Sequence, residues 1–391
     1  MNHTLDRVLT ALRQVNAGAL MNALVNCCEE ALRRPLPISL PRTVDIALTK
    51  ACNLRCVQCI SYGSAKDSRW LPFELYERIA AALFHTSLKV EFCSGGEPFL
   101  YARIRDALSL ARRYRNVTDV TSNGMLISRD VAHWLAEDQT LEDLRISFDG
   151  ARKETLERIR RGARHETILN NIEYLSTIRD RNGLRFPRLS LRFSIMRSNA
   201  EELLELFELC DKYGFERVQV QYLIVANSVD LQESMYFHRQ LCKDLFGRAR
   251  AKAREYGVEL ELPPLMSTER QSRRCLHPWQ AMRIDTDGSI RFCGRSWRQR
   301  VGFWDDGWES VWRGRIMSEI RRTIDSDEPY FPYCSYCSSR RGFDREGSMA
   351  VDPGSDVYVI SGLEDLQVPF NMRTEESAFA FKQVKSERAA T

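Results

Sequence analysis

The chain has 391 residues, of which 28% are charged and 43% hydrophobic, and its net charge is only +4. A charge this close to balance does not indicate nucleic-acid binding, and no apolar run is long enough to predict a membrane span. Twelve cysteines without a signal peptide favour a reducing, cytoplasmic location over a disulfide framework.

The first 42 residues are predicted to form an N-terminal helical segment. Leu5, Val8, Leu9 and Leu12 recur at helical spacing, and a proline-rich link closes the segment. Cys27 and Cys28 fall on this segment, while Cys210 and Cys242 fall on later helices. All four are predicted to be small buried hydrophobic residues.

A predicted strand at 43–49 leads into three cysteines with the spacing Cys52-x-x-x-Cys56-x-x-Cys59. Thiolates are soft ligands that suit zinc, copper(I) and iron–sulfur clusters. Three of them in one loop can hold three irons of a [4Fe–4S] cube and leave the fourth iron open. A zinc loop that lacks its last ligand is the alternative, but structural zinc prefers paired C-x-x-C units and a closed shell.

A second predicted strand, 88–93, ends in Cys93 and is followed by a Gly-Gly-Glu-Pro loop. Gly95 and Gly96 permit a close approach of the backbone to a ligand, and Glu97 beside them could bind an ammonium group. In isolation, an ordinary strand-to-helix turn would explain the same residues.

Together, these two loops resemble the signature of the radical S-adenosylmethionine (SAM) superfamily. The resemblance implies that Cys52, Cys56 and Cys59 ligate a [4Fe–4S] cluster and that SAM chelates its open iron. The loop of Gly95, Gly96, Glu97 and Pro98 would line the amino end of SAM. The position before the third cysteine, often aromatic in this family, is Gln58 here, so an aromatic contact with adenine is not expected at this position.

Strand-like runs then alternate with amphipathic helices, which indicates βα units and a mainly parallel sheet. The fold class is therefore α/β, with a partial (β/α)6 TIM-like barrel over 43–262 as the radical SAM core. The predicted strands are 43–49, 88–93, 117–121, 143–148, 188–196 and 217–224, and helices between them include 72–82, 154–160 and 200–213.

Polar residues at the ends of these strands are candidates for the site, because parallel barrels carry their chemistry at the C-terminal strand ends. We expect Ser122, Asn123 and Ser147 to hold the ribose and carboxylate of SAM. The alternative is that Asn-Gly and Asp-Gly at these ends are simply turn formers.

Two residues are candidates for catalytic contact with the substrate. Tyr222 lies beside Gln221 near the end of the sixth strand, where a core position is the alternative. Cys93 is a candidate because some radical SAM epimerases quench a substrate radical with a cysteine thiol; for Cys93 too, a core position is the alternative.

A second group of cysteines follows the barrel. Cys275 and Cys293 flank a predicted hairpin, and Cys334 and Cys337 form a C-x-x-C pair. Four thiolates close one metal site, and both zinc and [4Fe–4S] accept them. Their order resembles the SPASM domain or its shortened form, twitch, which would be a small α+β domain over 263–340 with one auxiliary [4Fe–4S] cluster. The remainder, 341–391, is a C-terminal extension with a predicted strand at 357–360.

The resemblance implies that SAM is cleaved to a 5′-deoxyadenosyl radical, which abstracts a hydrogen atom from the substrate. An auxiliary cluster ligated on all four corners has no open iron, so its natural role is to accept an electron. We therefore expect a radical SAM oxidoreductase that dehydrogenates a small metabolite, such as a sugar or aminocyclitol, in a biosynthetic pathway. A flavodoxin- or ferredoxin-type protein would serve as reductant.

Two other functions stay open. One is the cross-linking or epimerisation of a ribosomally made peptide, although the short N-terminal segment leaves little room for a leader-binding module. The other is a non-catalytic scaffold stabilised by metal, against which the intact cysteines and Glu97 argue.

Overall fold

The computed structural model describes residues 16–59, 69–93, 95–226, 229–265, 271–272, 274–294, 299–326, 328–331, 334, 341–342, 349–351, 357–360 and 368–369. Its centre is a 10-stranded sheet with the strand order β12-β11-β10-β1-β2-β3-β4-β5-β6-β8. The strands are β1 (Thr43–Ile46), β2 (Lys89–Phe92), β3 (Val117–Ser122), β4 (Asp143–Ser147), β5 (Arg188–Ile195), β6 (Arg217–Tyr222), β8 (Glu259–Glu261), β10 (Ala281–Ile284), β11 (Ser289–Arg291) and β12 (Gly302–Phe303).

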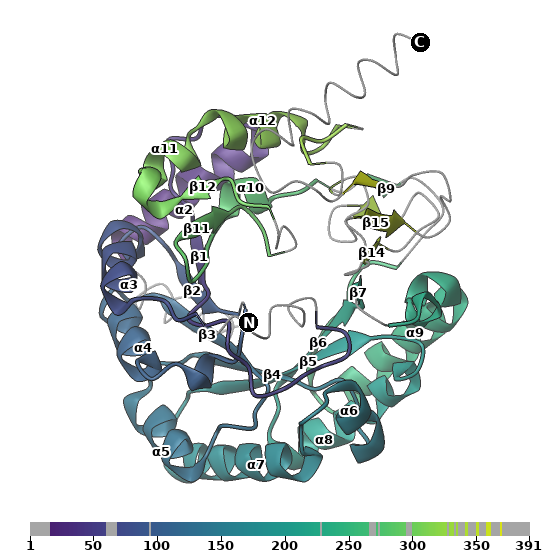
Figure 1. Cartoon of the computed structure of the whole chain (residues 1–391). Helices are drawn as coiled ribbons and strands as arrows, with labels where there is room; N and C mark the ends of the chain where they lie inside the picture. Colours follow the sequence, from purple (N-terminus) through teal and green to yellow (C-terminus); the bar gives the residue numbers. More distant parts are fainter. Residues whose placement is uncertain are drawn as a thin grey trace, which may run out of the picture.

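The strands from β1 to β6 follow one another in space as in sequence, and each pairs in parallel with the next. The predicted α/β class and the predicted strands are therefore confirmed, with ends that differ by a few residues. Figure 1 shows the sheet curved into an arc with helices outside it, as in a partial barrel. These helices are α3 (Phe73–Ile79), α4 (Ile104–Arg113), α5 (Arg129–Asp138), α6 (Lys153–Ile159), α7 (His165–Arg181), α8 (Leu206–Tyr213) and α9 (Arg239–Glu255).

Alternation along the strands gives the sheet two chemically different faces. On β6, Val218, Val220 and Tyr222 are buried, while Arg217 and the two glutamines that alternate with them are only partly buried. Burial of each large apolar side chain against the helices contributes roughly 1.5–3 kcal/mol. The outer face therefore holds the hydrophobic core, and polar residues line the concave side of the arc.

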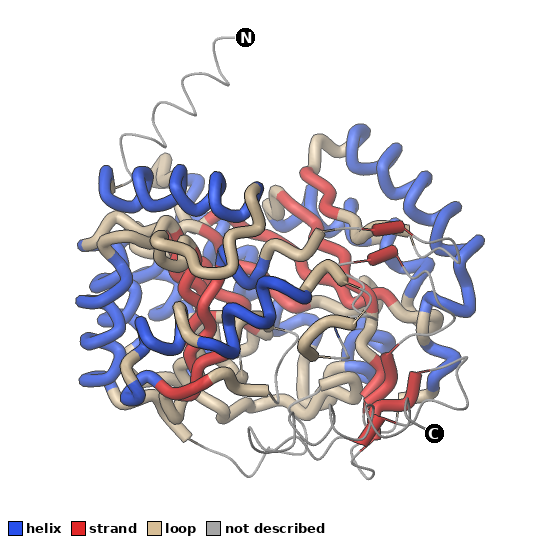
Figure 2. The backbone as a smooth tube through the Cα atoms, turned by 90° about the horizontal axis from the view of Figure 1, so that it is seen from above, coloured by secondary structure: helices blue, strands red, loops and turns tan. Residues whose placement is uncertain are grey.

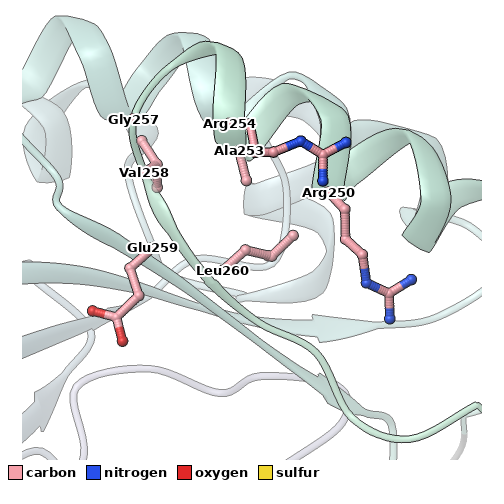
Figure 3. A pocket seen from close by; sticks show the side chains of 7 residues that line it. All are labelled: Arg250, Ala253, Arg254, Gly257, Val258, Glu259 and Leu260. Carbon is pink, nitrogen blue, oxygen red and sulfur yellow. The ribbon is translucent and has the colours of Figure 1, made fainter.

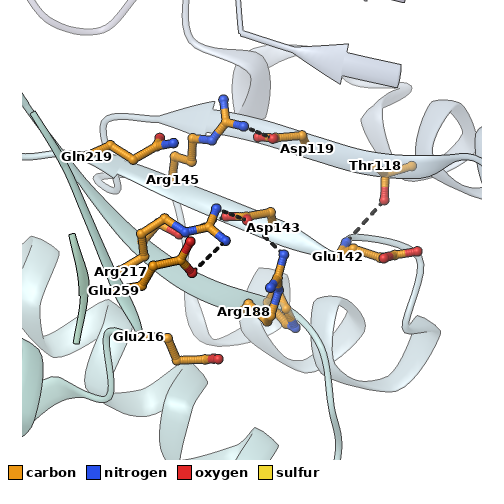
Figure 4. Close-up of polar contacts among 12 residues, drawn as sticks. Thr118, Asp119, Glu142, Asp143, Arg145, Arg188, Glu216, Arg217, Gln219 and Glu259 are labelled. Atoms are coloured by element: carbon orange, nitrogen blue, oxygen red, sulfur yellow. Dashed lines mark hydrogen bonds and ion pairs between the residues drawn. The ribbon is translucent and has the colours of Figure 1, made fainter. Parts of the chain in front are cut away.

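We call that concave side the inner face. Its described charged strand residues are Asp45, Lys89, Glu91, Asp119, Asp143, Arg145, Arg188, Arg192, Arg217, Glu259, Glu261, Arg283 and Arg291. Figure 4 shows part of this network, with Arg145 directed at Asp119 and Arg217 between Asp143 and Glu259. Most of these charges are thus paired across neighbouring strands.

The hairpin after the barrel extends the barrel's own sheet. β10 pairs with β1 in parallel, so that Asp45 lies opposite Arg283, and β11 returns antiparallel to β10. This pairing supplies hydrogen-bond partners to the edge that β1 would otherwise expose. Two short helices of the same region follow, α11 (Trp308–Trp312) and α12 (Arg315–Thr323).

The N-terminal helix α2 (Ala17–Ala31) packs against this C-terminal region, beside the short helix α10 (His277–Gln280). The Asn26 side chain, fully buried, donates to the carbonyl of Trp279 at 2.7 Å, and the Trp279 indole donates to the carbonyl of Arg34 at 2.8 Å. The prediction of buried cysteines is wrong for Cys27 and Cys28, which are exposed. It is confirmed for Cys210 and Cys242.

A small second sheet lies at the end of the chain. β14 (Met349–Val351) pairs with β7 (Val225–Ala226) and with β15 (Val357–Ile360), which in turn pairs with β16 (Val368–Pro369). The predicted strand at 357–360 is therefore confirmed. Figure 2 shows strands through the middle of the molecule and helices at its periphery. In the part of the chain that is described, no helix combines the length and apolarity needed to cross a membrane.

Candidate active site

The loop that carries the cysteine triplet begins at the C-terminal end of β1 and is held by the Gly-Gly-Glu loop after β2. The Gly96 amide donates to the carbonyl of Thr49, and the Glu97 amide donates to the carbonyl of Ala51, both at 2.7 Å. A Cβ atom on Gly96 would lie 1.9 Å from the Ala51 oxygen, so only glycine permits this approach. The glycines therefore bring the two loops together.

Glu97 joins these loops to the end of β3. Its carboxylate is 2% exposed and accepts hydrogen bonds from the Ser122 hydroxyl and from the Asn123 amide, each at 2.7 Å. The Asn123 side chain reaches on to Asn53 in the cysteine loop at 2.7 Å. The structure thus brings together three predicted cofactor contacts, but their polar atoms brace one another. Their contact with SAM stays a prediction.

Ser147 differs from these three residues. It ends β4 on the inner face and is only partly buried. Within the described residues, its hydroxyl makes no hydrogen bond to another side chain or to the backbone. Of the predicted hydroxyl contacts, Ser147 is therefore the one that can still bind a cofactor.

Two residues that sequence reasoning missed or ranked low lie beside the cysteines. The Arg160 guanidinium lies 3.9 Å from the Cys56 sulfur and 2.8 Å from the carboxylate of Asp149, which is fully buried. Asp149 also accepts from the Ser194 amide at 2.7 Å and from the Gln58 side chain. In the sequence, Arg160 resembles a solvated helix end and Asp149 resembles a turn former, so neither gave a distinctive signal.

The three thiols are close enough to influence one another's ionisation. Burial raises the pKa of Cys56 to about 11, Arg160 opposes this shift, and the Cys52 and Cys59 thiols reinforce it. Ligation requires thiolates, so the positive charge of Arg160 favours the form that binds metal.

Within the described residues, no three cysteine, histidine or acidic side chains converge on a single ion position. Three cysteines of one loop can each bind a different iron of a cube. The side-chain oxygen of Gln58 is buried without a hydrogen-bond partner, so it can accept a donor from a cofactor beside the loop. The donor set and its surroundings therefore fit a [4Fe–4S] cluster with SAM.

An ion pair links the same loop to the C-terminal hairpin. Lys50, two residues before Cys52, pairs with Asp285 after β10, and the Asp285 carboxylate also forms an ion pair with Arg291 at 2.6 Å. Burial alone would raise the pKa of Asp285, but Lys50 and Arg291 hold it below its usual value. The cysteine loop and the hairpin that precedes Cys293 are thus braced by shared charges.

Cys93 lies on the inner face, where Thr121 donates to its sulfur at 3.3 Å and Arg145 lies 3.8 Å away. Burial first, and then Asp119 and Glu91, raise the pKa of the thiol far above its usual value. Cys93 therefore remains a thiol, with its hydrogen still bound to sulfur.

Tyr222 lies on the opposite face of the sheet. It is 4% exposed, its ring stacks on Phe246 of α9 with centroids 6.2 Å apart, and its hydroxyl donates to the carbonyl of Pro264 at 2.9 Å. This placement contradicts the predicted catalytic contact, because that face of β6 packs against α9. Gln221, one residue earlier, faces inward.

The described cysteines of the second group come from three separate segments. Cys293 and Cys334 are buried and Cys275 is partly buried; Cys337 lies outside the described residues. Phe292 and Phe331, near two of these cysteines, stack with centroids 5.7 Å apart. The amide of Cys275 donates to Asp325 at 3.0 Å, close to the end of α12.

A hollow of about 450 Å³ lies elsewhere, between the end of α9 and the start of β8 (Figure 3). Arg250, Arg254 and Glu259 are among its lining residues. Because β8 runs parallel to β6, this hollow is at the N-terminal edge of the sheet, the edge opposite the cysteine loop. It is not part of the candidate site.

The fold and the site define a partial α/β barrel that carries three cysteines in the loop after its first strand. Residues 46–180 match the model of the Radical SAM superfamily. This part of the chain therefore carries a radical SAM domain, and proteins with this domain use a [4Fe–4S] cluster and SAM as cofactors.

Two curated relatives resemble parts of the chain. It is 28% identical over 167 residues to the mycofactocin maturase MftC of Mycolicibacterium smegmatis, which is 43% of this chain and 41% of the relative. It is 24% identical over 205 residues to the GTP 3′,8-cyclase of Limosilactobacillus fermentum, which is 49% of this chain and 58% of the relative. The chain thus spans less than two thirds of either relative.

Among solved structures, SuiB of Streptococcus suis bound to S-adenosylmethionine has a similar fold. Its TM-score is 0.59 at 18% identity, over 73% of this chain and 68% of SuiB. SuiB bound to its precursor peptide SuiA gives a TM-score of 0.58. At this identity, the similarity establishes the fold.

Proposed function

We propose that the chain oxidises its substrate after abstraction of a hydrogen atom, as a SAM-dependent oxidoreductase. The observation that carries this proposal is the position of the cysteine loop, which Gly96 and Glu97 hold at the C-terminal edge of the sheet above a polar inner face. When bound, the cluster and SAM supply a one-electron cleavage that yields a radical able to react with an unactivated C–H bond.

The chain's own residues would hold and shield these groups. Cys52, Cys56 and Cys59 would ligate the cluster, and Arg160 would offset its negative charge. Ser147 and the unpartnered oxygen of Gln58 would contact SAM. The hydrogen-bonded loops around them would exclude water.

The second cysteine group would form a SPASM- or twitch-type auxiliary site. We assign Cys275, Cys293, Cys334 and Cys337 to a second [4Fe–4S] cluster, which would accept the electron left on the substrate. The ring pair of Phe292 and Phe331 supports this assignment, since it joins two of the segments that carry the cysteines. A flavodoxin- or ferredoxin-type protein would supply the initial electron.

We propose a small polar metabolite, such as a sugar or aminocyclitol, as the substrate. The charged inner face supports this choice, because a polar ligand can replace the hydrogen bonds of water there.

Modification of a peptide is the second candidate. It is favoured by the matching structure of SuiB, which has a precursor peptide bound. The Cys93 thiol would suit a redox-neutral epimerisation, since its raised pKa keeps the hydrogen available.

Anaerobic reconstitution tests the proposal. Two cubes require about eight irons and eight sulfides per chain. With dithionite and SAM, wild-type protein should release 5′-deoxyadenosine and methionine, and Cys56→Ala should lower that rate by at least about a thousandfold. Cys28→Ala, on the exposed side of α2, is the matched control and should keep full activity.

Deuterated candidate substrates then separate the two substrate classes. Transfer of deuterium into 5′-deoxyadenosine from a sugar or aminocyclitol supports the metabolite, and transfer from a peptide supports the second candidate. Stoichiometric zinc with no release of 5′-deoxyadenosine would refute both and favour the scaffold.

A further inference from the structure

Almost every cation on the inner face has a carboxylate partner. Unpaired charges are costly at buried positions, so this pairing is what a folded barrel requires. The pairs are Lys89–Asp119 at 2.8 Å, Arg145–Asp119, Arg188–Asp143 at 3.3 Å, Arg217–Asp143 at 3.1 Å, Arg283–Asp45 at 3.9 Å and Arg291–Asp285 at 2.6 Å.

Arg192 on β5 is the exception. Its guanidinium donates from Nε and Nη2 to the side-chain oxygen of Gln221, at 3.2 and 2.9 Å. Within the described residues, no carboxylate lies within ion-pair distance of it. The side chain is only partly buried, so its remaining N–H groups can reach a ligand.

Gln221 fixes the direction of this cation. The Gln221 amide donates to the Ser194 hydroxyl at 2.8 Å while its oxygen accepts from Arg192, so the amide is held at both ends. A guanidinium that is already oriented loses little conformational freedom when it binds an anion.

Arg192 also lies at the depth where a substrate would meet the cofactors. It is level with Ser147 at the end of β4. It lies two residues before Ser194, about 7 Å along the strand. The Ser194 amide binds Asp149, which holds Arg160 beside Cys56. The free cation is therefore just beneath the cysteine loop.

We propose that Arg192 binds an anionic group of the substrate, a carboxylate or a phosphate. A planar guanidinium forms paired, charge-assisted hydrogen bonds with either group, and the bound anion would complete the charge pairing of the inner face. The inference rests on the proposed function, because it assigns the inner face to the substrate. The inference restricts the class of substrates to molecules with a negative charge near the C–H bond that reacts.

Anion binding without turnover tests this inference. Reconstituted full-length protein with SAM, but no reductant, is titrated calorimetrically with inorganic phosphate and separately with malonate, at constant ionic strength in chloride. We expect the dissociation constant of the preferred anion to rise at least about tenfold in Arg192→Gln, as expected for a lost charge-assisted hydrogen bond. Arg248→Gln, on the exposed side of α9, should bind as wild type does.

The two anions distinguish the sources of the charge. Preference for phosphate indicates a phosphorylated substrate, and preference for malonate indicates a carboxylate. Arg192→Lys keeps the positive charge but loses the paired N–H groups of the guanidinium, so it should weaken the binding of malonate more than the binding of phosphate. This variant also replaces Arg192→Gln in the test if Arg192→Gln does not fold. Equal binding by wild type and both variants, or no binding by wild type, would overturn the inference. Release of 5′-deoxyadenosine is measured separately, so failure of the proposed function would be seen on its own.

Discussion

The two cysteine-bearing regions are held in place by different forces. The loop with Cys52, Cys56 and Cys59 depends on main-chain hydrogen bonds from the loop after the neighbouring strand, through Gly96 and Glu97. The segments with Cys275, Cys293 and Cys334 instead depend on tertiary packing, through the Phe292–Phe331 ring pair and α2.

This difference follows from sequence distance. A triplet within one loop needs only a neighbouring loop to fix its shape, so its motif can be short and its glycines decide the approach. Cysteines on distant segments meet only after helices and strands have packed. We therefore expect backbone changes to damage the first region and side-chain changes to act more locally in the second.

The largest effect is expected from Gly96→Ala. The added Cβ would overlap the Ala51 carbonyl at 1.9 Å and force the two loops apart. We expect a loss of roughly 2–3 kcal/mol in the free energy of unfolding and loss of the iron held by the triplet. Urea denaturation and iron analysis measure the two effects.

Gly247→Ala is the matched control for that substitution. Gly247 is exposed on α9, and nothing lies within 4 Å of its added Cβ. Here alanine should stabilise the helix by up to about 1 kcal/mol. If Gly96→Ala behaved like Gly247→Ala, the backbone pairing could not be what holds the cysteine loop.

A smaller effect is expected from Cys293→Ser in the second region. About four of eight irons should be lost, while the triplet keeps its own cluster. Release of 5′-deoxyadenosine should stay within about threefold of wild type, but oxidised product should fall about tenfold or more. Both are measured in one anaerobic assay, with Cys28→Ala as control; equal product in the two variants would exclude an auxiliary electron acceptor.

Glu97→Gln should act on stability in a way that depends on pH. Burial raises the pKa of Glu97 above its ordinary value of 4.5, although its hydrogen bonds from Asn123 and Ser122 oppose the shift. A carboxyl with a raised pKa contributes stability that is complete below pH 4.5 and is lost as the pH rises through the folded-state value. The advantage of wild type, about 1–3 kcal/mol, should therefore shrink as the pH rises.

Urea unfolding of the metal-free proteins from acid to neutral pH measures this difference. A difference that grew with pH would mean that the hydrogen bonds to the carboxylate outweigh its burial. Such a result would make Glu97 an anionic brace at neutral pH.

Much of the barrel could be predicted from the sequence because its signals are local. Alternating apolar runs separated by helices indicated all six strands, and the cysteine triplet with Gly95 and Gly96 indicated the cluster site. The long-range pairing of β10 with β1 had no such signal, because neither strand encodes its partner. The ion pair of Lys50 with Asp285 depends on that strand pairing, so the sequence did not predict it either.

Which face a residue occupies at a strand end was the least predictable feature. Ser122 and Ser147 carry the same hydroxyl at the ends of adjacent strands. The Ser122 hydroxyl donates a hydrogen bond to Glu97, whereas Ser147 is only partly buried on the inner face. The difference comes from the pleat, since a one-residue offset moves a side chain to the other face of the sheet. The triplet fixes where the site lies, but only the register decides which polar residues face it.

The smallest expected effect concerns such an offset at the end of β6. Tyr222→Phe removes the hydrogen bond to Pro264 and should cost about 1 kcal/mol of stability, with release of 5′-deoxyadenosine unchanged within about twofold. Gln221→Leu, one residue earlier, should cost a similar amount of stability, because Arg192 loses its acceptor and Ser194 loses its donor, and it should also weaken anion binding because Arg192 is no longer held in one direction. Calorimetric titration and thermal unfolding of both variants compare the two faces directly. If Tyr222→Phe lost turnover but kept its stability, the result would mean that the Tyr222 hydroxyl takes part in the reaction.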